Sequence, residues 1–543
     1  MPKITDAVIR QNPNPKIPLA AVLSFRTDAP VAVDAALISA GHERKISFPM
    51  GCDPAAGLPI IGMRAGTAYE VRVQVTDGAG KTETLPPLHY TTPPLPGDLR
   101  NFPRFDVIRA ETENMEPGFT MLSLRRRMVT RMIWMSKRQR HFLNDWSLLV
   151  ALDAEGQVVW YYEADHRIGG MHRLQNGNLF FTSMDYRAFE MDFLGNIERV
   201  WYASKRPKGP VEGGISIEAE SLHHQPHEMP NGNFLAMTAN SREFENYLTS
   251  ETDPDAPRGT KRVVGDRIIE FTAEGGVVWS WDAFDHLDPY RIGYDTFSPF
   301  WHVRGFPHHV DWTHGNGVTF DKVNGGMIIS LRHQDAFFKV DRDTGEVIWI
   351  LGTHDGWEKP FSDKLLQPVD PDIRWPFHGH NPRVTDDGTI CVYDNAAFQA
   401  RPFTPAKKPA ECFSRGVEYL VDERKGTVEE VWASADDGTE DKVVSWAMGD
   451  CHRLPKTNNM LVIDSVCMPE GPELSWQGNI TTDDLTWEQW DRNCWNISDF
   501  ALWGRIREYR RNSNRDVVFE IVVRDPDDLV GWEVYGGLRT PDL

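Results

Sequence analysis

Apolar and polar residues alternate along the first ninety-six positions of the chain. The stretches AAVLSFRTD (20–28) and AYEVRVQVTD (68–77) show this alternation, and the second runs into the turn signal DGAGK. A period of two predicts strands with one buried face, and short strands separated by such turns are typical of a small sandwich. We therefore expect an immunoglobulin-like β-sandwich over residues 1–96, followed at 91–98 by a stiff proline-rich linker, TTPPLPGD.

Residues 97–543 repeat one unit, in which a turn of N-G or D-G type precedes apolar strands and the last strand ends in tryptophan. Copies occupy residues 148–164, 172–203, 227–283, 324–352, 382–434 and 452–523. The first copy contains only the later strands, and the last has Phe519 where tryptophan is expected. Six copies of about four short strands each predict a six-bladed β-propeller over residues 97–543, so the predicted fold class is all-β. Amphipathic helices do not alternate with these strands, which argues against a TIM barrel.

The tryptophans that end successive copies are Trp160, Trp201, Trp279, Trp349 and Trp432. Because each blade of a propeller faces an equivalent neighbour, we expect these side chains to pack blades together rather than to bind an aromatic ligand.

Three insertions interrupt the repeats, at residues 284–313, 353–379 and 469–500, and are rich in Trp, His, Pro and Asp. Long segments without periodicity are typical of lids and binding loops. The last insertion is equally suited to roofing an aromatic ligand and to covering one propeller face.

The formal net charge of −21 argues against a general affinity for nucleic acid or an anionic membrane, because both would be repelled. No stretch approaches the roughly eighteen apolar residues of a membrane-spanning helix, and the N-terminal stretch lacks the pattern of a signal peptide. The cysteines contain no C-x-x-C pair: they are Cys52, Cys391, Cys412, Cys451, Cys467 and Cys494. We therefore expect a reduced cytoplasmic protein, or a periplasmic one if a presequence has been removed.

Histidine recurs at the head of the first strand of successive copies. The residues are His172, His224 or His227, His314, His380 and His452. First strands line the axis of a propeller, so these histidines are expected to ring one mouth of it, although duplication of one ancestral unit would also repeat them. His378 lies on the loop that leads to His380.

The stretch HGNGVTFDKVNGGMIISLRHQ (314–334) adds polar groups to this ring. It places His314 and Asn316 before a turn and Arg332 at the far end of the following strand. A guanidinium is a fixed cation whose planar fork suits sulfate, phosphate or carboxylate oxygens. The alternative is that Arg332 only forms a salt bridge with Asp335 or Asp341.

These motifs resemble the bacterial aryl-sulfate sulfotransferase family, whose members work without 3′-phosphoadenylyl sulfate. The similar stretches are HHQPHEMPNGNFLAM (223–237), the segment 314–352 that begins HGNGVTF, GHNPRVTDDGTICVYDN (379–395) and SRGVEYLVDERKGTVEEVW (414–432). The resemblance implies an aryl sulfate donor, a phenolic acceptor and ping-pong transfer, with no cofactor and no metal, and suggests a homodimer by analogy. This sequence departs from the family in two ways. It lacks an export signal, and it has FHGH (377–380) where a glutamine usually precedes the histidine that corresponds to His380.

Residue by residue, the resemblance implies that His380 is the nucleophile that becomes transiently sulfated. His314, Asn316 and Arg332 would bind and polarise the sulfuryl oxygens, and His224 would complete the ring. The remaining candidates for contact with substrate are His223, His227, His333, His452 and His378.

Sulfuryl transfer, like phosphoryl transfer, requires mainly positioning and electrostatic stabilisation of equatorial oxygens. A neutral imidazole can attack sulfur, while a protonated neighbouring histidine donates to the departing phenolate. Three alternatives stay open: a histidine-ligated iron, zinc or manganese enzyme, which the arginine disfavours; a non-catalytic propeller that binds a protein partner; and the same scaffold acting as a hydrolase or lyase on a related aromatic compound.

Overall fold

The computed structural model describes residues 3–129, 137–298, 300–301, 304–407, 411–468, 501–512 and 514–543. Within these ranges the regular secondary structure is almost entirely strand, which confirms the predicted all-β class. The helical elements of the same ranges are short: α1 (Lys137–Asn144), α2 (Ala283–His286), η1 (Thr112–Asn114), η3 (Arg332–Gln334) and η4 (Phe361–Lys364). No helix in the described part of the chain has the length and apolar character needed to cross a bilayer.

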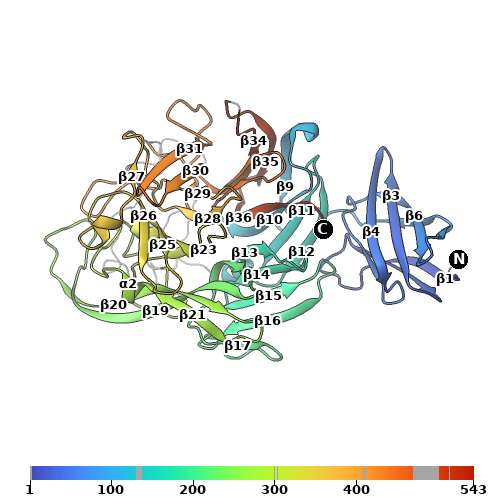
Figure 1. Cartoon of the computed structure of the whole chain (residues 1–543), viewed down its shortest axis with the longest axis horizontal. Helices are drawn as coiled ribbons and strands as arrows, with labels where there is room; N and C mark the ends of the chain where they lie inside the picture. The colour runs from blue at the N-terminus through green and yellow to red at the C-terminus, as the bar shows by residue number, and fades with distance from the viewer. Residues whose placement is uncertain are drawn as a thin grey trace.

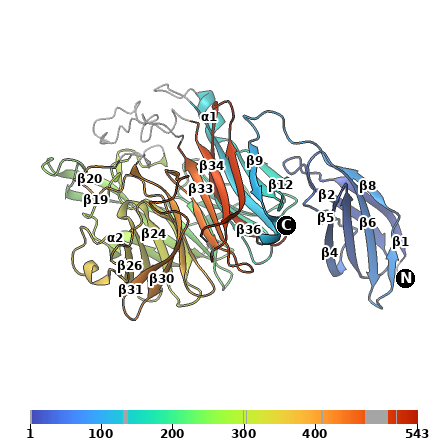
Figure 2. The ribbon, with the colours of Figure 1, turned by 90° about the horizontal axis from the view of Figure 1, so that it is seen from above.

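The N-terminal segment forms two antiparallel sheets with a common core. One contains β1 (Ile4–Gln11), β2 (Ala21–Thr27) and β5 (Leu58–Ile60); the other contains β3 (Val31–Ser39), β4 (His42–Cys52), β6 (Ala68–Asp77), β7 (Thr82–Thr84) and β8 (Leu88–Thr91). The alternation in the sequence is the cause, because every second residue of β2, β3 and β6 is buried in one cluster. Figures 1 and 2 show these sheets at one end of the molecule, beside the larger body.

Six further sheets, each of four or five strands, make up the described part of the larger body. The first sheet contains β36 (Val530–Thr540), β10 (Phe119–Met128), β11 (Ser147–Leu152) and β12 (Val158–Ala164), and the second contains β13 (Ile168–Arg173), β14 (Leu179–Ser183), β15 (Arg187–Met191), β16 (Ile197–Ala203) and β17 (Ile215–Ile217). The third contains β18 (His223–Glu228), β19 (Phe234–Tyr247), β20 (Gly259–Phe271), β21 (Val277–Asp282) and β22 (His309–Asp311), and the fourth contains β23 (Gly315–Phe320), β24 (Met327–Leu331), β25 (Ala336–Val340) and β26 (Val347–Gly352). The fifth contains β28 (His380–Val384), β29 (Ile390–Asp394), β30 (Arg415–Asp422), β31 (Thr427–Ala433) and β27 (Gln367–Pro368), and the sixth contains β32 (Asp450–Arg453), β33 (Met460–Cys467), β34 (Trp503–Tyr509), β35 (Val517–Arg524) and β9 (Arg104–Ala110).

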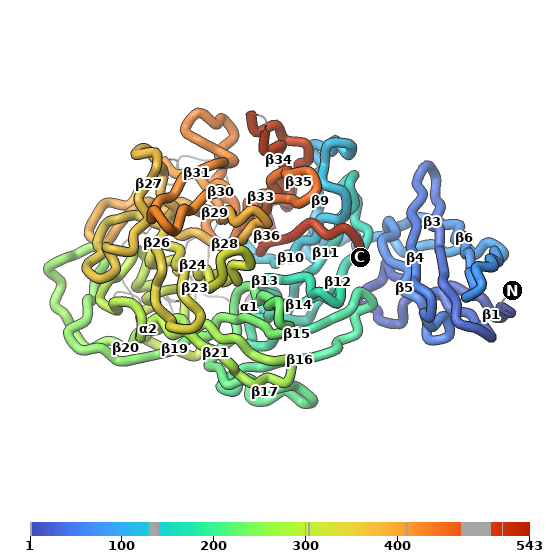
Figure 3. The backbone as a smooth tube through the Cα atoms, in the orientation of Figure 1, coloured from blue at the N-terminus to red at the C-terminus, as the bar shows by residue number. Residues whose placement is uncertain are grey.

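The first strands of the six sheets contact one another in a closed cycle. The order around it is β36, β13, β18, β23, β28, β32 and back to β36, which gives a propeller-like arrangement (Figure 1). The cycle is completed by the C-terminus: β36 pairs with β10 in antiparallel register, with Thr120 opposite Arg539 and Leu122 opposite Gly537. Figure 3 shows this last strand beside the much earlier β10. The strand missing from the first sequence repeat is therefore supplied from the other end of the chain.

The repeated tryptophans tie neighbouring sheets together, as the sequence predicts. Four indole N–H groups donate to the β-turn region of the next sheet: Trp160 to Phe193 O (2.9 Å), Trp201 to Ala273 O (2.9 Å), Trp279 to Arg342 O (2.6 Å) and Trp349 to a Glu423 carboxylate oxygen (3.0 Å). The ring of Trp432 packs 5.8 Å from that of Tyr509 in the following sheet. The prediction that these residues pack one repeat against the next is confirmed.

Two of the predicted insertions are described, at least in part. Residues 284–313 contain part of α2 and β22 and lie directly against η3, so closely that a Cβ at Gly293 would fall 1.5 Å from the carbonyl oxygen of His333. Residues 353–379 contain η4 and β27. The insertion at 469–500 lies outside the described residues.

Candidate active site

Three of the predicted histidines lie at the starts of three neighbouring first strands. His224 is the second residue of β18, His314 immediately precedes β23, and His380 begins β28. Each of these strands has a register irregularity in its first residues, and both His224 (φ 59°) and His314 (φ 46°) adopt left-handed backbone. An extra residue at a strand start turns a side chain away from its regular face. The ring centroids of His224 and His314 consequently lie 5.9 Å apart.

His380 is held in one tautomer by its surroundings. Its Nδ1 lies 3.0 Å from the carbonyl oxygen of His378 and 2.6 Å from Oδ1 of Asn395. The amide of Asn395 is oriented by its Nδ2, which donates to the carbonyl oxygens of Ser445 and Met448 at 2.9 Å each. Because both neighbours of Nδ1 are acceptors, Nδ1 carries the proton and Nε2 carries the lone pair. Nε2 in turn accepts the backbone N–H of Met448 at 3.1 Å.

The electrostatic environment keeps His380 neutral. Its side chain is 3% exposed, and burial together with the nearby charge of Arg332 lowers its pKa to about 3. Burial also lowers the pKa of His224 well below its usual value, with His223, His314 and His380 adding to the effect. At neutral pH the His380 ring is thus uncharged, which is the form of an imidazole that can act as a nucleophile.

His314 differs from His380 because a carboxylate occupies its Nδ1 side. Nδ1 of His314 lies 2.5 Å from Oδ2 of Asp311, and the other oxygen of Asp311 accepts the indole N–H of Trp301 at 3.0 Å. Burial raises the pKa of Asp311 to about 6, and burial lowers the pKa of His314 well below its usual value, aided by His333 and Arg332. If the pair takes up one proton, Nε2 of His314 carries a hydrogen whichever partner holds the shared one. The pair can therefore donate a proton and later recover it.

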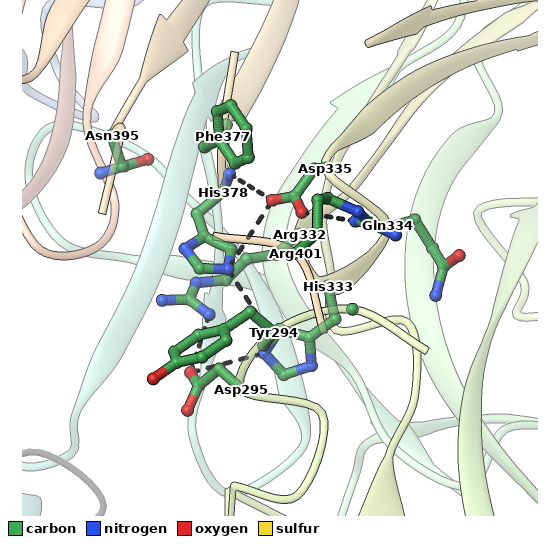
Figure 4. A network of polar contacts seen from close by, with 12 residues as sticks. Tyr294, Asp295, Arg332, His333, Gln334, Asp335, Phe377, His378, Asn395 and Arg401 are labelled. Carbon is green, nitrogen blue, oxygen red and sulfur yellow. Dashed lines mark hydrogen bonds and ion pairs between the residues drawn. The ribbon is translucent and has the colours of Figure 1, made fainter. Parts of the chain in front are cut away.

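Arg332 and Asn316 lie beside these histidines. Arg332 is 1% exposed, and its Nη1 is 3.0 Å from Oδ2 of Asp295, which comes from the insertion at 284–313. Its ion pair is thus with Asp295, whereas Asp335 pairs with Arg401 at 2.8 Å (Figure 4). Asn316 is also 1% exposed, and within the described residues neither its Oδ1 nor its Nδ2 has a hydrogen-bond partner. An amide buried in this way loses hydration without compensation, which indicates a place for a polar ligand.

Two further candidates, His333 and His378, pack around Arg332 (Figure 4). Nδ1 of His333 bonds the carbonyl oxygen of Asp311 at 2.6 Å, and its ring centroid is 4.8 Å from that of His314. Burial opposes a charge on His333, but Asp311 and Asp295 outweigh it and raise the pKa. His378 is fully buried with Nε2 3.4 Å from the carbonyl oxygen of Tyr294, and burial lowers its pKa well below the usual value.

His223 contacts His224 and Trp301. Its Nδ1 lies 2.7 Å from Nδ1 of His224, and its ring packs edge-on against Trp301 at 5.2 Å. His224 rather than His227 is therefore the member of HHQPH that lies beside His314.

The structure does not bring His172, His227 or His452 to this group, contrary to the expectation of one ring at one mouth. His172 and His227 lie further along their strands, 5.0 Å apart by ring centroid. Burial lowers the pKa of His227 to about 4, and the nearby charges of Arg383 and Lys322 add to this. His452 contacts Asp450, with Nε2 3.1 Å from a carboxylate oxygen, and Arg383 binds the same carboxylate. His172, His227 and His452 each pair with the second residue of the following strand. His380 instead pairs with Tyr393, near the end of β29, so the register of these three histidines differs from that of His380.

Sequence reasoning missed several residues of the site. Asn395 and Asp311 lie within hydrogen-bond distance of His380 and His314, respectively, and Asp295 pairs with Arg332. Tyr535, on the C-terminal strand β36, lies 6.3 Å from His224 by ring centroid and carries the guanidinium of Arg125 on its face at 4.2 Å. Only the D-x-x-H spacing of Asp311 and His314 is visible in the sequence, because the other partners are distant along the chain.

Within the described residues, one group of side chains could hold a metal ion. Donor atoms of Asp311, His314 and His333 all lie within 4.8 Å of one another, and imidazole with carboxylate suits zinc, iron or manganese. However, Asp311 already hydrogen-bonds His314, and the charge of Arg332 acts on the titration of each of the three groups. The positive charge of Arg332 would repel a divalent metal ion bound by these three side chains. The arrangement favours an anionic ligand.

Comparison with known proteins gives a family match and two curated relatives. Residues 106–527 match the family model described as arylsulfotransferase (ASST). Arylsulfate sulfotransferase AssT from Escherichia coli O6:H1 (strain CFT073) is 28% identical over 333 residues, 52% of this chain and 51% of that protein. The protein of the same name from Lelliottia amnigena is 26% identical over 337 residues, again 52% and 51%. The chain thus spans about half the length of these curated relatives.

Among solved structures, an auxiliary nutrient binding protein from Bacteroides thetaiotaomicron VPI-5482 has a TM-score of 0.31 and 9% sequence identity, covering 98% of this chain and 90% of that chain. A similarity of this size carries no functional argument. The family model, in contrast, covers well over half of the chain and includes the whole group of histidines described above. The chain belongs to the arylsulfotransferase (ASST) family.

Proposed function

We propose that the protein transfers a sulfuryl group from an aryl sulfate to a phenolic acceptor through a covalent sulfohistidine at His380, without a nucleotide donor. The observation that carries the proposal is the fixed, neutral tautomer of His380, whose pKa is lowered by burial and by the nearby charge of Arg332. The names of the two curated relatives support the same donor class.

In the first step, the Nε2 lone pair of His380 attacks sulfur while the bond between sulfur and the aryl oxygen breaks. The attack replaces the hydrogen bond from Met448 N–H to Nε2. Arg332, Asn316 and His224 bind the sulfuryl oxygens as negative charge spreads over them. His314, protonated together with Asp311, gives its Nε2 proton to the leaving phenolate.

In the second step, the acceptor phenol attacks the sulfur of sulfated His380. Its proton passes to Nε2 of His314, and the electrons of the N–S bond return to Nε2 of His380. The pair of His314 and Asp311 is then protonated again, so the cycle consumes no net proton. Two partial reactions through one covalent enzyme form are the basis of ping-pong kinetics.

The finer features of the molecule form part of the proposal. We assign residues 97–543 as a six-bladed β-propeller and residues 1–96 as an immunoglobulin-like β-sandwich, since the closed cycle of first strands and the two N-terminal sheets support both. The partners are small aromatic molecules; a homodimer and a cytoplasmic location rest on analogy and on sequence pattern.

The function can be tested with 4-nitrophenyl sulfate and phenol. Phenol-dependent release of nitrophenol, and a mass increase of one SO₃ group on the protein when phenol is omitted, are the expected results. His380→Ala should abolish both, whereas His89→Ala, at an exposed position of β8, should change neither. Nitrophenol release that does not depend on an acceptor would indicate a hydrolase.

A stoichiometric transition metal in the purified protein, required for this release, would favour the alternative in which Asp311, His314 and His333 ligate an ion.

A further inference from the structure

The two histidines of the proposed reaction have different partners at the same ring position. Nδ1 of His314 faces the carboxylate of Asp311 at 2.5 Å, whereas Nδ1 of His380 faces the amide oxygen of Asn395 at 2.6 Å. A carboxylate can take a proton from an imidazole, and an amide oxygen cannot do so near neutral pH. The two rings are thus supported in opposite ways for proton transfer.

The amide of Asn395 has only one orientation available. It is fully buried, directly after β29, and both of its N–H groups are used by the carbonyl oxygens of Ser445 and Met448. Its Oδ1 must therefore face His380. The second oxygen at Nδ1, from the backbone of His378, is not basic either. Among the described residues, both oxygens within hydrogen-bond distance of Nδ1 accept a hydrogen bond from it, but neither is basic enough to remove its proton.

The Nδ1 proton decides how easily a sulfated ring gives up its sulfuryl group. When Nε2 attacks sulfur, its lone pair forms the N–S bond, the S–O bond breaks, and the electron pair leaves on the aryl oxygen. The ring then carries a positive charge with hydrogen on Nδ1 and the sulfuryl group on Nε2. If that hydrogen stays, the next acceptor displaces neutral imidazole; if it is lost, the leaving group is the far more basic imidazolate. Better leaving groups depart faster.

We propose that Asn395 is a positioning residue that retains the Nδ1 proton on sulfated His380 and so keeps the sulfuryl group transferable to a phenol. This inference rests on the proposed function, because it concerns the lifetime of the intermediate in that reaction. A carboxylate of the same shape could not take the place of the Asn395 amide, because it could remove the Nδ1 proton of sulfated His380.

The test is Asn395→Asp, which places a base at the same position. With 4-nitrophenyl sulfate, we expect the first burst of nitrophenol to remain, while turnover in phenol falls about 10-fold or more. Sulfated protein should accumulate in the presence of phenol and be visible by intact mass. Turnover like that of the unmodified protein, or equal slowing of both steps, would overturn the proposal.

A matched control is Asn381→Asp. Asn381 is a buried neighbour of His380 whose Nδ2 donates to the carbonyl oxygen of Gly449 at 2.8 Å, in the same loop that Asn395 holds. This variant disturbs the loop without placing a base on His380, so the ratio of burst to turnover should stay unchanged.

A measurement on the unmodified protein keeps the inference testable if Asn395→Asp does not fold. In ¹⁵N-labelled protein, His380 should show a proton on Nδ1 and none on Nε2 near neutral pH. A proton on Nε2 would contradict the role of Asn395 even if sulfuryl transfer is found. Conversely, absence of any transfer would contradict the proposed function while leaving this tautomer result intact.

Discussion

Asn316 is the residue whose environment makes least sense without a ligand. Its amide is 1% exposed and within the described residues has no hydrogen-bond partner at either polar atom. Such a group destabilises the folded protein, because the unfolded chain hydrates it fully. Asn459 provides the contrast: it is also buried, but its Nδ2 donates to Asn114 O and to Glu508.

We therefore expect Asn316→Leu to separate stability from activity. The substitution should leave the free energy of unfolding unchanged or raise it by about 1 kcal/mol, while sulfuryl transfer falls by about 10²-fold through loss of a donor to the sulfuryl oxygens. Urea unfolding and nitrophenol release measure the two effects. Asn459→Leu should instead destabilise the protein, since it leaves a carboxylate of Glu508 with one donor fewer; loss of stability in Asn316→Leu would contradict a ligand-binding role.

Among the strand elements, the fourth strand of five of the six described sheets contacts the next sheet through its tryptophan. The indole of Trp201 is fully buried, packs 5.2 Å from Phe234 and 6.0 Å from Phe271 by ring centroid, and donates to Ala273 O. Two contributions can be distinguished here: apolar contact, which is the larger, and one hydrogen bond. Both act between two neighbouring sheets, which gives the tryptophan a structural role.

Substitution of Trp201 should show the two contributions separately. Trp201→Phe should cost about 1 kcal/mol of unfolding free energy through the lost hydrogen bond, plus the contact of the smaller ring. Trp201→Ala should cost about 3–5 kcal/mol, because it leaves a cavity. Thermal and urea unfolding check this, with the activity of folded protein as the control. A change in sulfuryl transfer by folded Trp201→Phe would instead favour the alternative that the repeated tryptophans bind an aromatic ligand.

For the molecule as a whole, burial of neutral histidines makes the fold sensitive to acid. The folded pKa values of His224, His314, His378 and His380 all lie below the usual histidine value, mainly through burial. Below about pH 6.5 the unfolded chain binds protons that the folded chain does not, so stability falls as the pH falls. Asp311 and Glu251 act in the opposite sense, since burial raises the pKa of Asp311 to about 6 and that of Glu251 to about 8.

His380→Gln should therefore make the protein less sensitive to acid. The pKa of His380 is about 3 in the folded state, so between pH 6 and 4 its removal should reduce the slope of unfolding free energy against pH by up to about 1.4 kcal/mol per pH unit. Urea titrations at several pH values measure the slope. A slope in His380→Gln equal to that of the unmodified protein would show that this ring is not kept neutral.

The sequence by itself determined the class of fold and the main candidate residues of the site. Alternation of period two, turn dipeptides and the repeated tryptophan are local signals, and local signals persist because each strand must bury one face wherever it lies. His380, His314, Asn316 and Arg332 were identified from motifs within short segments, and the structure places all four in one buried group.

Only the tertiary structure decided which other groups complete that site. Asn395, Ser445 and Met448 come to His380 from later parts of the chain, and β36 closes the cycle of sheets from the C-terminus. The choice of His224 over His227 follows from the irregular start of β18. Hydrogen-bond partners distant in sequence and single-residue irregularities have no periodic signature, because they arise only when the sheets pack around a common axis.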